Sequence, residues 1–182
     1  AAYYANSGGG VTASGGEAMC QADFVGALFK RCHMAGIHTA LDTCGYFDSS
    51  DFSKVSDFVN LVLFDIKLMD CEKHRRYTGV PNDTIIQNAR LISRHGIPMI
   101  VRVPLIPGIN DSEENLTEIA RFVTELESRP SVSLLPYHNY GENKYKMLSM
   151  DYQLTGLAAP DEAHMKRCAE IFEQYGLHCS VS

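Results

Sequence analysis

Strand-like and helix-like patterns alternate along the whole chain. Stretches with helical periodicity separate six apolar runs of strand length, which are Gly10 to Ser14, His38 to Thr43, Leu61 to Lys67, Met99 to Pro104, Val132 to Pro136 and Leu177 to Val181. A strand–helix–strand repeat of this kind predicts a parallel sheet covered by helices, either an open doubly wound sheet or a barrel. The alternation alone does not choose between these two architectures.

Four helices are predicted from their apolar faces and their end signals. They run from about Gln21 to Gly36, from Asp83 to Gly96, from Asp111 to Glu127 and from about Pro160 to Gly176. In the third helix, Asp111 and Glu114 have the spacing of a capping box. The stretch from Tyr140 to Ala159 has no such pattern, so we expect one long irregular segment there, a candidate lid or docking surface.

Composition limits the classes of partner. Sixteen basic and 22 acidic residues give a formal net charge of −6, which argues against a general nucleic-acid surface and against an anionic membrane patch. The apolar runs are far shorter than the roughly 20 residues that cross a bilayer, and the printed sequence does not open on a signal-peptide pattern. With 45% hydrophobic residues, we expect residues 1–182 to form a single domain in the cytoplasm.

The cysteines do not have the spacing of a metal or cluster loop. They are Cys20, Cys32, Cys44, Cys71, Cys168 and Cys179. The closest two, Cys168 and Cys179, are eleven positions apart, whereas zinc and iron-sulfur loops place their cysteines within a few residues of one another. Reduced thiols, most of them buried, are therefore expected.

Polar residues stand at or near the carboxyl end of five of the apolar runs. They are Gly15, Gly16 and Glu17, then Asp42 and Thr43, then Asp65 and Lys67, then Arg102, and finally His138. In a parallel βα architecture these positions share one rim, where binding and catalytic groups gather. Each taken alone is more often a turn, a cap, a structural ion pair or a core histidine. Their coincidence on one predicted rim favours a binding site.

The individual motifs narrow the chemistry. Gly15 and Gly16 allow a ligand close to the backbone, but the Lys-Ser/Thr pair of a P-loop is absent, which argues against a nucleoside triphosphatase. Strand alternation predicts that Asp65 and Lys67 point to the same face. Arg102 offers a planar fork to a carboxylate or a ribose hydroxyl.

The adjacent carboxylate and hydroxyl of Asp42 and Thr43 admit more than one role. They could accept hydrogen bonds from an ammonium group or hold a hard cation through oxygen, and Asp42 could equally cap the next turn. The motif itself leaves these three roles open.

Together these motifs resemble the radical S-adenosylmethionine activating enzymes of glycyl radical enzymes, and pyruvate formate-lyase activating enzyme is the most similar type. The matching segments are GGGVTASGGE at 8–17, DTCG at 42–45, FDIK at 64–67, RVPLIPG at 102–108 and LLPYH at 134–138. They occur in order along nearly the whole chain. Five ordered motifs are far more specific than any one of them.

The resemblance implies a fold and a set of site residues. The fold is a partial TIM-like (β/α) barrel with parallel strands that lacks its N-terminal βα unit, with S-adenosylmethionine across the strand ends beside a 4Fe-4S cluster. The implied cofactor-binding residues are Gly15, Gly16, Glu17, Asp42, Lys67, Arg102 and His138. The first three would receive the methionine ammonium through backbone oxygens. A small monovalent cation would be held by Asp42, Thr43 and Asp65.

The resemblance also implies a reaction and partners. In the family reaction one electron passes from the reduced cluster to the sulfonium, which breaks to methionine and a 5′-deoxyadenosyl radical. That radical removes a hydrogen from a backbone glycine of a partner such as pyruvate formate-lyase. An electron donor such as flavodoxin or ferredoxin is implied, and the protein chiefly positions the reacting groups.

One feature of the family is absent from the chain. Family members hold the cluster with a Cys-x-x-x-Cys-x-x-Cys loop ahead of the first motif, and no such triplet occurs here. We therefore expect residues 1–182 to be the C-terminal part of a longer enzyme, without catalytic residues or cluster ligands and inactive alone. Two alternatives stay open: a Schiff-base aldolase that uses Lys67, and a noncatalytic domain that only docks a protein partner.

Overall fold

The computed structural model describes residue 4, residues 8–152 and residues 154–182. Its strands are β1 (Gly10–Ala13), β2 (His38–Thr43), β3 (Leu61–Asp65), β4 (Met99–Leu105), β5 (Ser131–Pro136) and β6 (Cys179–Val181). Its helices are the 3-10 turns η1 (Ala18–Gln21) and η2 (Ser49–Lys54) and the α-helices α2 (Ala22–Met34), α3 (Cys71–Thr78), α4 (Asp83–Arg94), α5 (Glu113–Thr124), α6 (Gly141–Met147) and α7 (Glu162–Gln174). Within the described residues, none of these helices is long and apolar enough to cross a membrane.

The six strands lie side by side in the order in which they occur along the chain, and each neighbouring pair is parallel. Crossovers between parallel strands are right-handed, so a sheet that always advances in one direction carries its helices on one face. A doubly wound sheet instead reverses its strand order at a switch point. The uniform order therefore selects the barrel-type architecture from the two that the alternation predicts.

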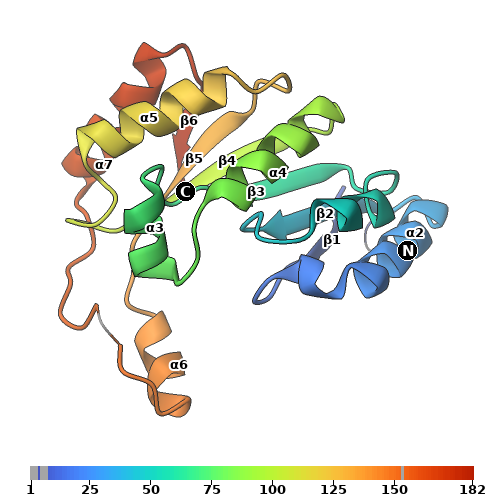
Figure 1. Ribbon diagram of the computed structural model, residues 1–182, viewed down its shortest axis with the longest axis horizontal. Helices are drawn as coiled ribbons and strands as arrows, with labels where there is room; N and C mark the ends of the chain where they lie inside the picture. Colours follow the sequence, from blue (N-terminus) through green and yellow to red (C-terminus); the bar gives the residue numbers. More distant parts are fainter. Residues whose placement is uncertain (1–3, 5–7, 153) are drawn as a thin grey trace.

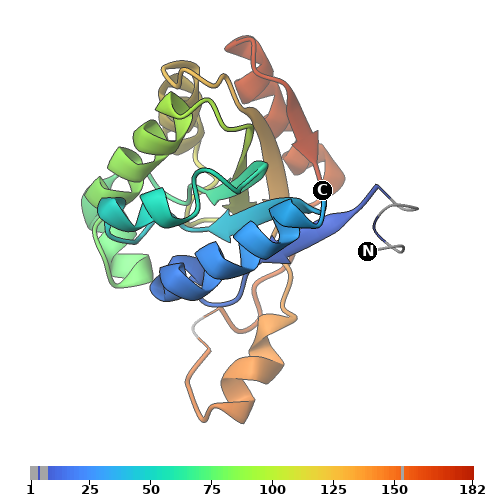
Figure 2. The same ribbon diagram turned by 90° about the vertical axis from the view of Figure 1, so that its right-hand side faces the viewer.

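The sheet curves but does not close. Figure 1 shows α2, α4, α5 and α7 around its outer side, and Figure 2 shows the curved sheet from the edge. The edge strands β1 and β6 are paired only with β2 and β5, respectively, in the described part of the chain. This arrangement confirms the predicted partial TIM-like barrel, and it leaves the inner face of the sheet accessible between its two edges.

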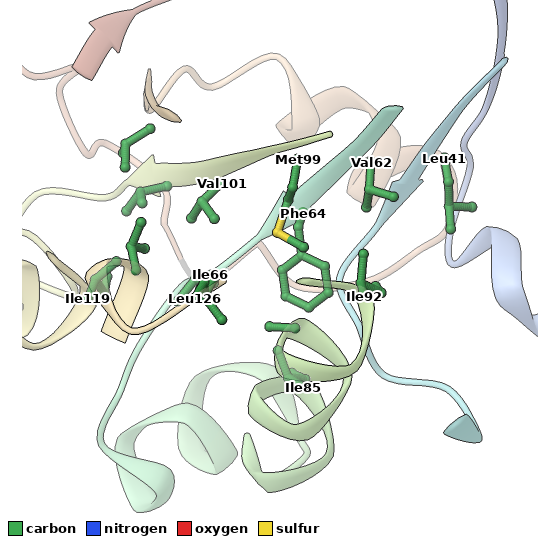
Figure 3. Packing of buried hydrophobic residues seen from close by; sticks show 14 of the residues in the cluster. Leu41, Val62, Phe64, Ile66, Ile85, Ile92, Met99, Val101, Ile119 and Leu126 are labelled. Atoms are coloured by element: carbon green, nitrogen blue, oxygen red, sulfur yellow. The ribbon is translucent and has the colours of Figure 1, made fainter. Parts of the chain in front are cut away.

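The hydrophobic core lies between the outer face of the sheet and the helices (Figure 3). On β3, Val62 and Phe64 are fully buried, whereas Asp65 on the inner face is half-buried, as strand alternation predicts. Ile92 of α4 and Ile119 of α5 cover the outer face and are completely buried. Burying one such side chain contributes about 1.5–3 kcal/mol. The core therefore fixes which residues of each strand face inward, because a one-residue slip would exchange the two faces.

The start of α5 differs from the prediction. Its N-cap is Ser112 and not Asp111, because the Ser112 hydroxyl oxygen accepts a hydrogen bond from the backbone N–H of Asn115 at 3.3 Å. The Asp111 carboxylate instead accepts from the Gly108 N–H at 2.8 Å and lies 2.9 Å from His164 of α7. The predicted capping box was wrong because these tertiary contacts occupy the Asp111 side chain.

The segment from Tyr140 to Ala159 contains the short helix α6. Figures 1 and 2 both show α6 projecting away from the sheet and the other helices. The hydroxyl groups of Tyr137 and Tyr152 lie 2.8 Å apart and join the two ends of this projection, which we call the α6 arm (residues 139–152). The expectation of a wholly irregular segment was wrong, because a helix of two turns is too short to show a clear apolar period.

Candidate functional site

Polar side chains from neighbouring strands meet on the inner face of the sheet, at the carboxyl ends of the strands. Arg102 of β4 lies at the centre, and its Nε and Nη2 lie 2.8 and 2.7 Å from Asp65 Oδ1 of β3. Its Nη1 donates to Asp42 Oδ2 of β2 at 3.2 Å, and its Nη2 also contacts the second oxygen of Asp42. Ser14, directly after β1, donates from its Oγ to Asp42 at 3.0 Å. Lys67 pairs with Asp65 at 3.4 Å.

We call these five residues, Ser14, Asp42, Asp65, Lys67 and Arg102, the rim network. Strand register brings it together, because Asp65 and Arg102 are partners in the β3–β4 pair and Asp42 lies on the next strand, β2. Residues at alternate positions of parallel strands share a face, so all three point inward. The expectation that separate motifs converge on one rim is confirmed for these positions.

The network is partly shielded from water and electrically balanced. The side chains of Asp42, Asp65 and Arg102 are only 18–23% exposed, and two carboxylates are matched by two basic groups. Burial alone would lower the pKa of Arg102, but its hydrogen bonds and charge contacts with the two aspartates raise that pKa above its ordinary value. The guanidinium is therefore a fixed positive charge at the rim.

Glu17 ties the glycine turn to the end of β2. Its Oε1 accepts from the Thr43 hydroxyl at 2.8 Å and from the Met19 N–H at 3.0 Å. Its Oε2 accepts from the Cys44 N–H at 2.9 Å. Burial, and then the hydrogen bond with Glu17, raise the pKa of the Cys44 thiol to about 11. The carboxylate thus positions two rim segments, and Cys44 stays a neutral thiol near pH 7.

The turn at Gly15 and Gly16 presents open backbone. A Cβ at either position would meet no atom within 4 Å. Gly15 has a φ of 134°, a conformation that residues with side chains rarely adopt. A ligand can therefore approach this stretch of backbone closely.

Thr43 does not join the two aspartates in a cation site through its side chain. Strand alternation turns it to the opposite face of the sheet from Asp42, where it is buried at 2% exposure. Its hydroxyl donates to Glu17 and accepts from the Gly45 N–H at 2.9 Å. Among the described residues, no group of three His, Cys, Asp or Glu side chains has a metal-binding arrangement. The Thr43 hydroxyl is therefore engaged away from Asp42 and Asp65, and the cation site at these three residues stays a prediction.

His138 lies on the same edge of the sheet as the network, two residues beyond β5. Its side chain is exposed, and its ring packs against that of Tyr140 with the centroids 4.4 Å apart. In the described part of the chain, no hydrogen bond or ion pair joins His138 to the rim network. The structure thus places His138 at the carboxyl rim but outside the network.

The surroundings of Lys67 do not favour a Schiff-base aldolase. An amine becomes an effective nucleophile when it is desolvated or placed beside another cation. The Lys67 side chain is 34% exposed and pairs with the Asp65 carboxylate. The Lys67 amine thus lies beside a carboxylate and partly in water, and not in a desolvated pocket.

The sequence did not single out three residues that contribute to this region. Ser14 ends the first apolar run and precedes the glycine turn, so its position is a strand-end signal like the others. Asn110 and Asn115 are buried and hydrogen-bonded to the segment that follows β3. Asparagine is common in turns, so their pattern in the sequence is not distinctive.

Comparison with known proteins finds activating enzymes of similar sequence. It is 41% identical over 182 residues to the trans-4-hydroxy-L-proline dehydratase activating enzyme of Clostridioides difficile, covering 98% of this chain and 60% of that relative. It is 47% identical over 148 residues to the isethionate sulfite-lyase activating enzyme of Oleidesulfovibrio alaskensis, covering 80% of this chain and 47% of the relative. The chain thus spans about half of the length of these relatives. No protein-family model matches it.

A solved structure has a similar fold over nearly the whole of both chains. The crystal structure of a domain of pyruvate-formate lyase-activating enzyme from Bacteroides vulgatus superimposes with a TM-score of 0.81 at 32% identity. The match covers 96% of this chain and 99% of that domain. The chain therefore belongs to the radical S-adenosylmethionine family of glycyl radical enzyme activating enzymes.

Proposed function

We propose that the protein containing these residues activates a glycyl radical enzyme and binds S-adenosylmethionine across the carboxyl ends of β1 to β5. The observation that carries the proposal is the rim network beside the open turn at Gly15 and Gly16. A zwitterionic amino acid group needs acceptors for its ammonium and positive groups for its carboxylate. Both kinds of group stand within this one rim.

The residues fit the cofactor in a defined way. Backbone oxygens at Gly15, Gly16 and Glu17 are proposed to receive the ammonium group. Lys67 and Arg102 supply positive charge for the carboxylate, and His138 lies further along the rim for the nucleoside part. When bound, S-adenosylmethionine supplies the 5′-deoxyadenosyl group whose radical removes a hydrogen from the partner's glycine. The chain's own residues bind and orient, and Glu17 holds the turn through its contacts with Thr43 and Cys44.

Arg102 is expected to change partners when the cofactor binds. It contacts both Asp42 and Asp65, so an interaction with a ligand requires it to share or release one carboxylate. Asp42 and Asp65 would hold a monovalent cation, and its positive charge would balance the carboxylate that Arg102 releases. We propose the cation site at Asp42 and Asp65, with Thr43 limited to backbone contact because its hydroxyl is engaged on the opposite face.

The ligands of a 4Fe-4S cluster are proposed to come from outside residues 1–182. A cluster needs closely placed thiolates, and the described residues contain no group of three candidate ligands. No step of the reaction is therefore assigned to a cysteine of this chain. We propose that residues 1–182 do not form the radical alone, that a flavodoxin or ferredoxin reduces the cluster of the whole protein, and that the protein works in the cytoplasm.

The α6 arm is the proposed contact surface for the glycyl radical enzyme. It exposes five large apolar side chains, which are 38–87% exposed: Tyr140, Tyr145, Met147, Leu148 and Met150. Exposed apolar groups gathered on one projection are typical of protein interaction sites, and methionine adapts readily to a partner surface. The arm leaves the body directly after His138, so a protein bound to it would reach the rim. The partner itself is not assigned, because the relatives are named for different target enzymes.

An experiment with the full-length protein tests the proposal. The cluster is reconstituted without oxygen, and the protein is incubated with S-adenosylmethionine, dithionite and, in turn, each glycyl radical enzyme of the same genome. The expected result is 5′-deoxyadenosine and the electron paramagnetic resonance doublet of a glycyl radical with one of them. Absence of S-adenosylmethionine binding to the reconstituted protein would contradict the proposed site, and formation of a borohydride-trapped Lys67 adduct with a carbonyl substrate would favour the aldolase instead.

A variant in the α6 arm separates binding of the partner enzyme from binding of S-adenosylmethionine. Met147→Asp places a charge on the exposed face of the α6 arm, away from the rim network. We expect it to reduce radical formation on the partner while the affinity for S-adenosylmethionine stays unchanged. Equal radical formation by the variant and the parent protein, at partner concentrations below saturation, would remove the α6 arm from the proposed interface.

A further inference from the structure

The chain that follows β3 is held by side-chain amides from another part of the fold. Asn110, in the loop between β4 and α5, is 2% exposed, and Asn115, in the first turn of α5, is 7% exposed. Both reach across to the segment 67–69, which leaves the strand end at Asp65. Buried amides are held in place by the hydrogen bonds they make, and each loss leaves an unpaired polar group.

The two amides converge on a single carbonyl group. The Asn110 Nδ2 donates to the Lys67 backbone oxygen at 3.0 Å, and the Asn115 Nδ2 lies 3.4 Å from the same oxygen. The Asn115 Oδ1 accepts from the Met69 N–H at 3.0 Å. The backbone that follows β3 is therefore held at two points, the Lys67 carbonyl and the Met69 N–H.

The same amides also fix the loop that supplies them. Asn110 accepts from the Ile106 N–H at 2.8 Å through its Oδ1 and donates to the Pro104 carbonyl at 2.7 Å through its Nδ2. Asn115 donates to the Asn110 carbonyl at 2.8 Å. The Lys67 segment is therefore clamped to the end of β4, the strand that carries Arg102. A shift of one element would move the other with it.

We propose that Asn110 and Asn115 are positioning residues for cofactor binding, which act by fixing the backbone of Lys67 so that its ammonium group stays at the rim beside Asp65. This inference rests on the proposed S-adenosylmethionine site and extends it. Lys67 has a long, flexible side chain, and regular strand structure ends at Asp65. Without the clamp, the backbone from which the ammonium group extends would be free to shift. Ligand binding would then have to order this backbone, and the lost entropy would weaken the affinity.

The test is a double-mutant cycle in the full-length reconstituted protein, read out as the dissociation constant of S-adenosylmethionine by anaerobic calorimetry. Asn110→Ala and Asn115→Ala are each expected to weaken S-adenosylmethionine binding about tenfold, which is the size of effect expected from the net loss of about one hydrogen bond. In a Lys67→Ala background, the same substitutions are expected to change the affinity less than about twofold, because their effect passes through Lys67.

A control variant separates positioning from general destabilisation. Thr39 is completely buried near the amino end of β2, and its hydroxyl donates to the Phe58 carbonyl. Thr39→Val should lower the melting temperature, as the asparagine variants do, yet leave the affinity for S-adenosylmethionine unchanged. If Asn110→Ala does not fold, Asn115→Ala carries the cycle, because the Asn115 amide also joins the loop to the segment 67–69, through Asn110, Lys67 and Met69.

The outcomes are distinguishable. Equal losses of affinity in the parent and Lys67→Ala backgrounds, or an equal loss in Thr39→Val, would overturn the positioning role while leaving the proposed function intact. A parent protein that binds no S-adenosylmethionine would overturn the proposed function, and the inference with it.

Discussion

The guanidinium of Arg102 lies 2.7 Å from the carboxylate of Asp65, its partner in register on the neighbouring strand. Because parallel register sets these two residues opposite each other, the pair forms as soon as β3 and β4 align. Asp42 then joins from β2 on the other side of Asp65's strand. A charge network that spans three strands thus depends on sheet register as much as on residue identity.

Replacement of Arg102 tests the strength of this network. Arg102→Met leaves two partly buried carboxylates without the guanidinium that they share. We expect a loss of about 2–4 kcal/mol in the free energy of unfolding, because both carboxylates stay partly desolvated and lose hydrogen bonds to a positive charge. Chemical denaturation at pH 7 measures it. Arg75→Met is the matched control, because the Arg75 and Glu72 side chains are 54% and 78% exposed and such surface pairs contribute about 0–1 kcal/mol. Equal effects of the two substitutions would contradict the proposed role.

Gly45 is predicted to tolerate no side chain. It has a φ of 78°, and a Cβ would lie 2.3 Å from the Phe64 ring in the core. Gly45→Ala should therefore combine backbone strain with a steric clash and destabilise the fold by about 3 kcal/mol or more. Gly36 has a similar φ of 68°, but a Cβ there would meet no atom within 4 Å. Gly36→Ala is therefore expected to destabilise the fold by only about 1 kcal/mol. Thermal unfolding compares them, and similar losses would show that Phe64 moves aside.

Glu17 and Thr43 are expected to act as a unit. Glu17→Ala removes three acceptor contacts, one of which is the N-cap of η1, and Thr43→Val removes one of the donors. Each should cost about 1–2 kcal/mol, with the double variant less destabilised than the sum by about 1 kcal/mol. The control Asp48→Ala removes the cap of η2, whose contacts with Ser50 are local. The destabilisation by Asp48→Ala should add to that by Thr43→Val. If the effects of Glu17→Ala and Thr43→Val also add fully in their double variant, the two residues are not coupled.

The Cys44 thiol is expected to react slowly. Its pKa is raised to about 11 by burial and by Glu17, so at pH 8 its thiolate fraction is roughly a hundredfold below that of an ordinary thiol. Alkylation by iodoacetamide, followed by peptide mass spectrometry, should label exposed Cys20 first. Because the folded-state pKa is raised, the stability from this neutral thiol is complete below its ordinary pKa of 9.0 and is lost as pH rises through about 11. Equal labelling rates in the folded protein would contradict this assignment.

Local patterns in the sequence correctly indicated most of the elements. The six apolar runs became six parallel strands, and alternation on β3 placed Phe64 outward and Asp65 inward. Three local expectations were wrong. Asp111 does not cap α5, because Gly108 and His164 occupy its carboxylate. Helices α3 and α6 were both missed, because two turns carry too little periodicity.

The amino-acid sequence alone determined the alternation of strands and helices, the inward or outward side of each strand residue, and the resemblance that gathers Gly15, Asp42, Asp65 and Arg102 into one set. The alternation, the side of each strand residue and each separate motif depend on residues near one another in the chain, and the resemblance rests on the order of the motifs. The tertiary structure decided the uniform strand order, the engagement of Thr43 by Glu17 on the opposite face, and the clamp of Asn110 on Lys67. Those contacts join residues 26 to 43 positions apart, and no local propensity encodes which distant donor will reach a given oxygen.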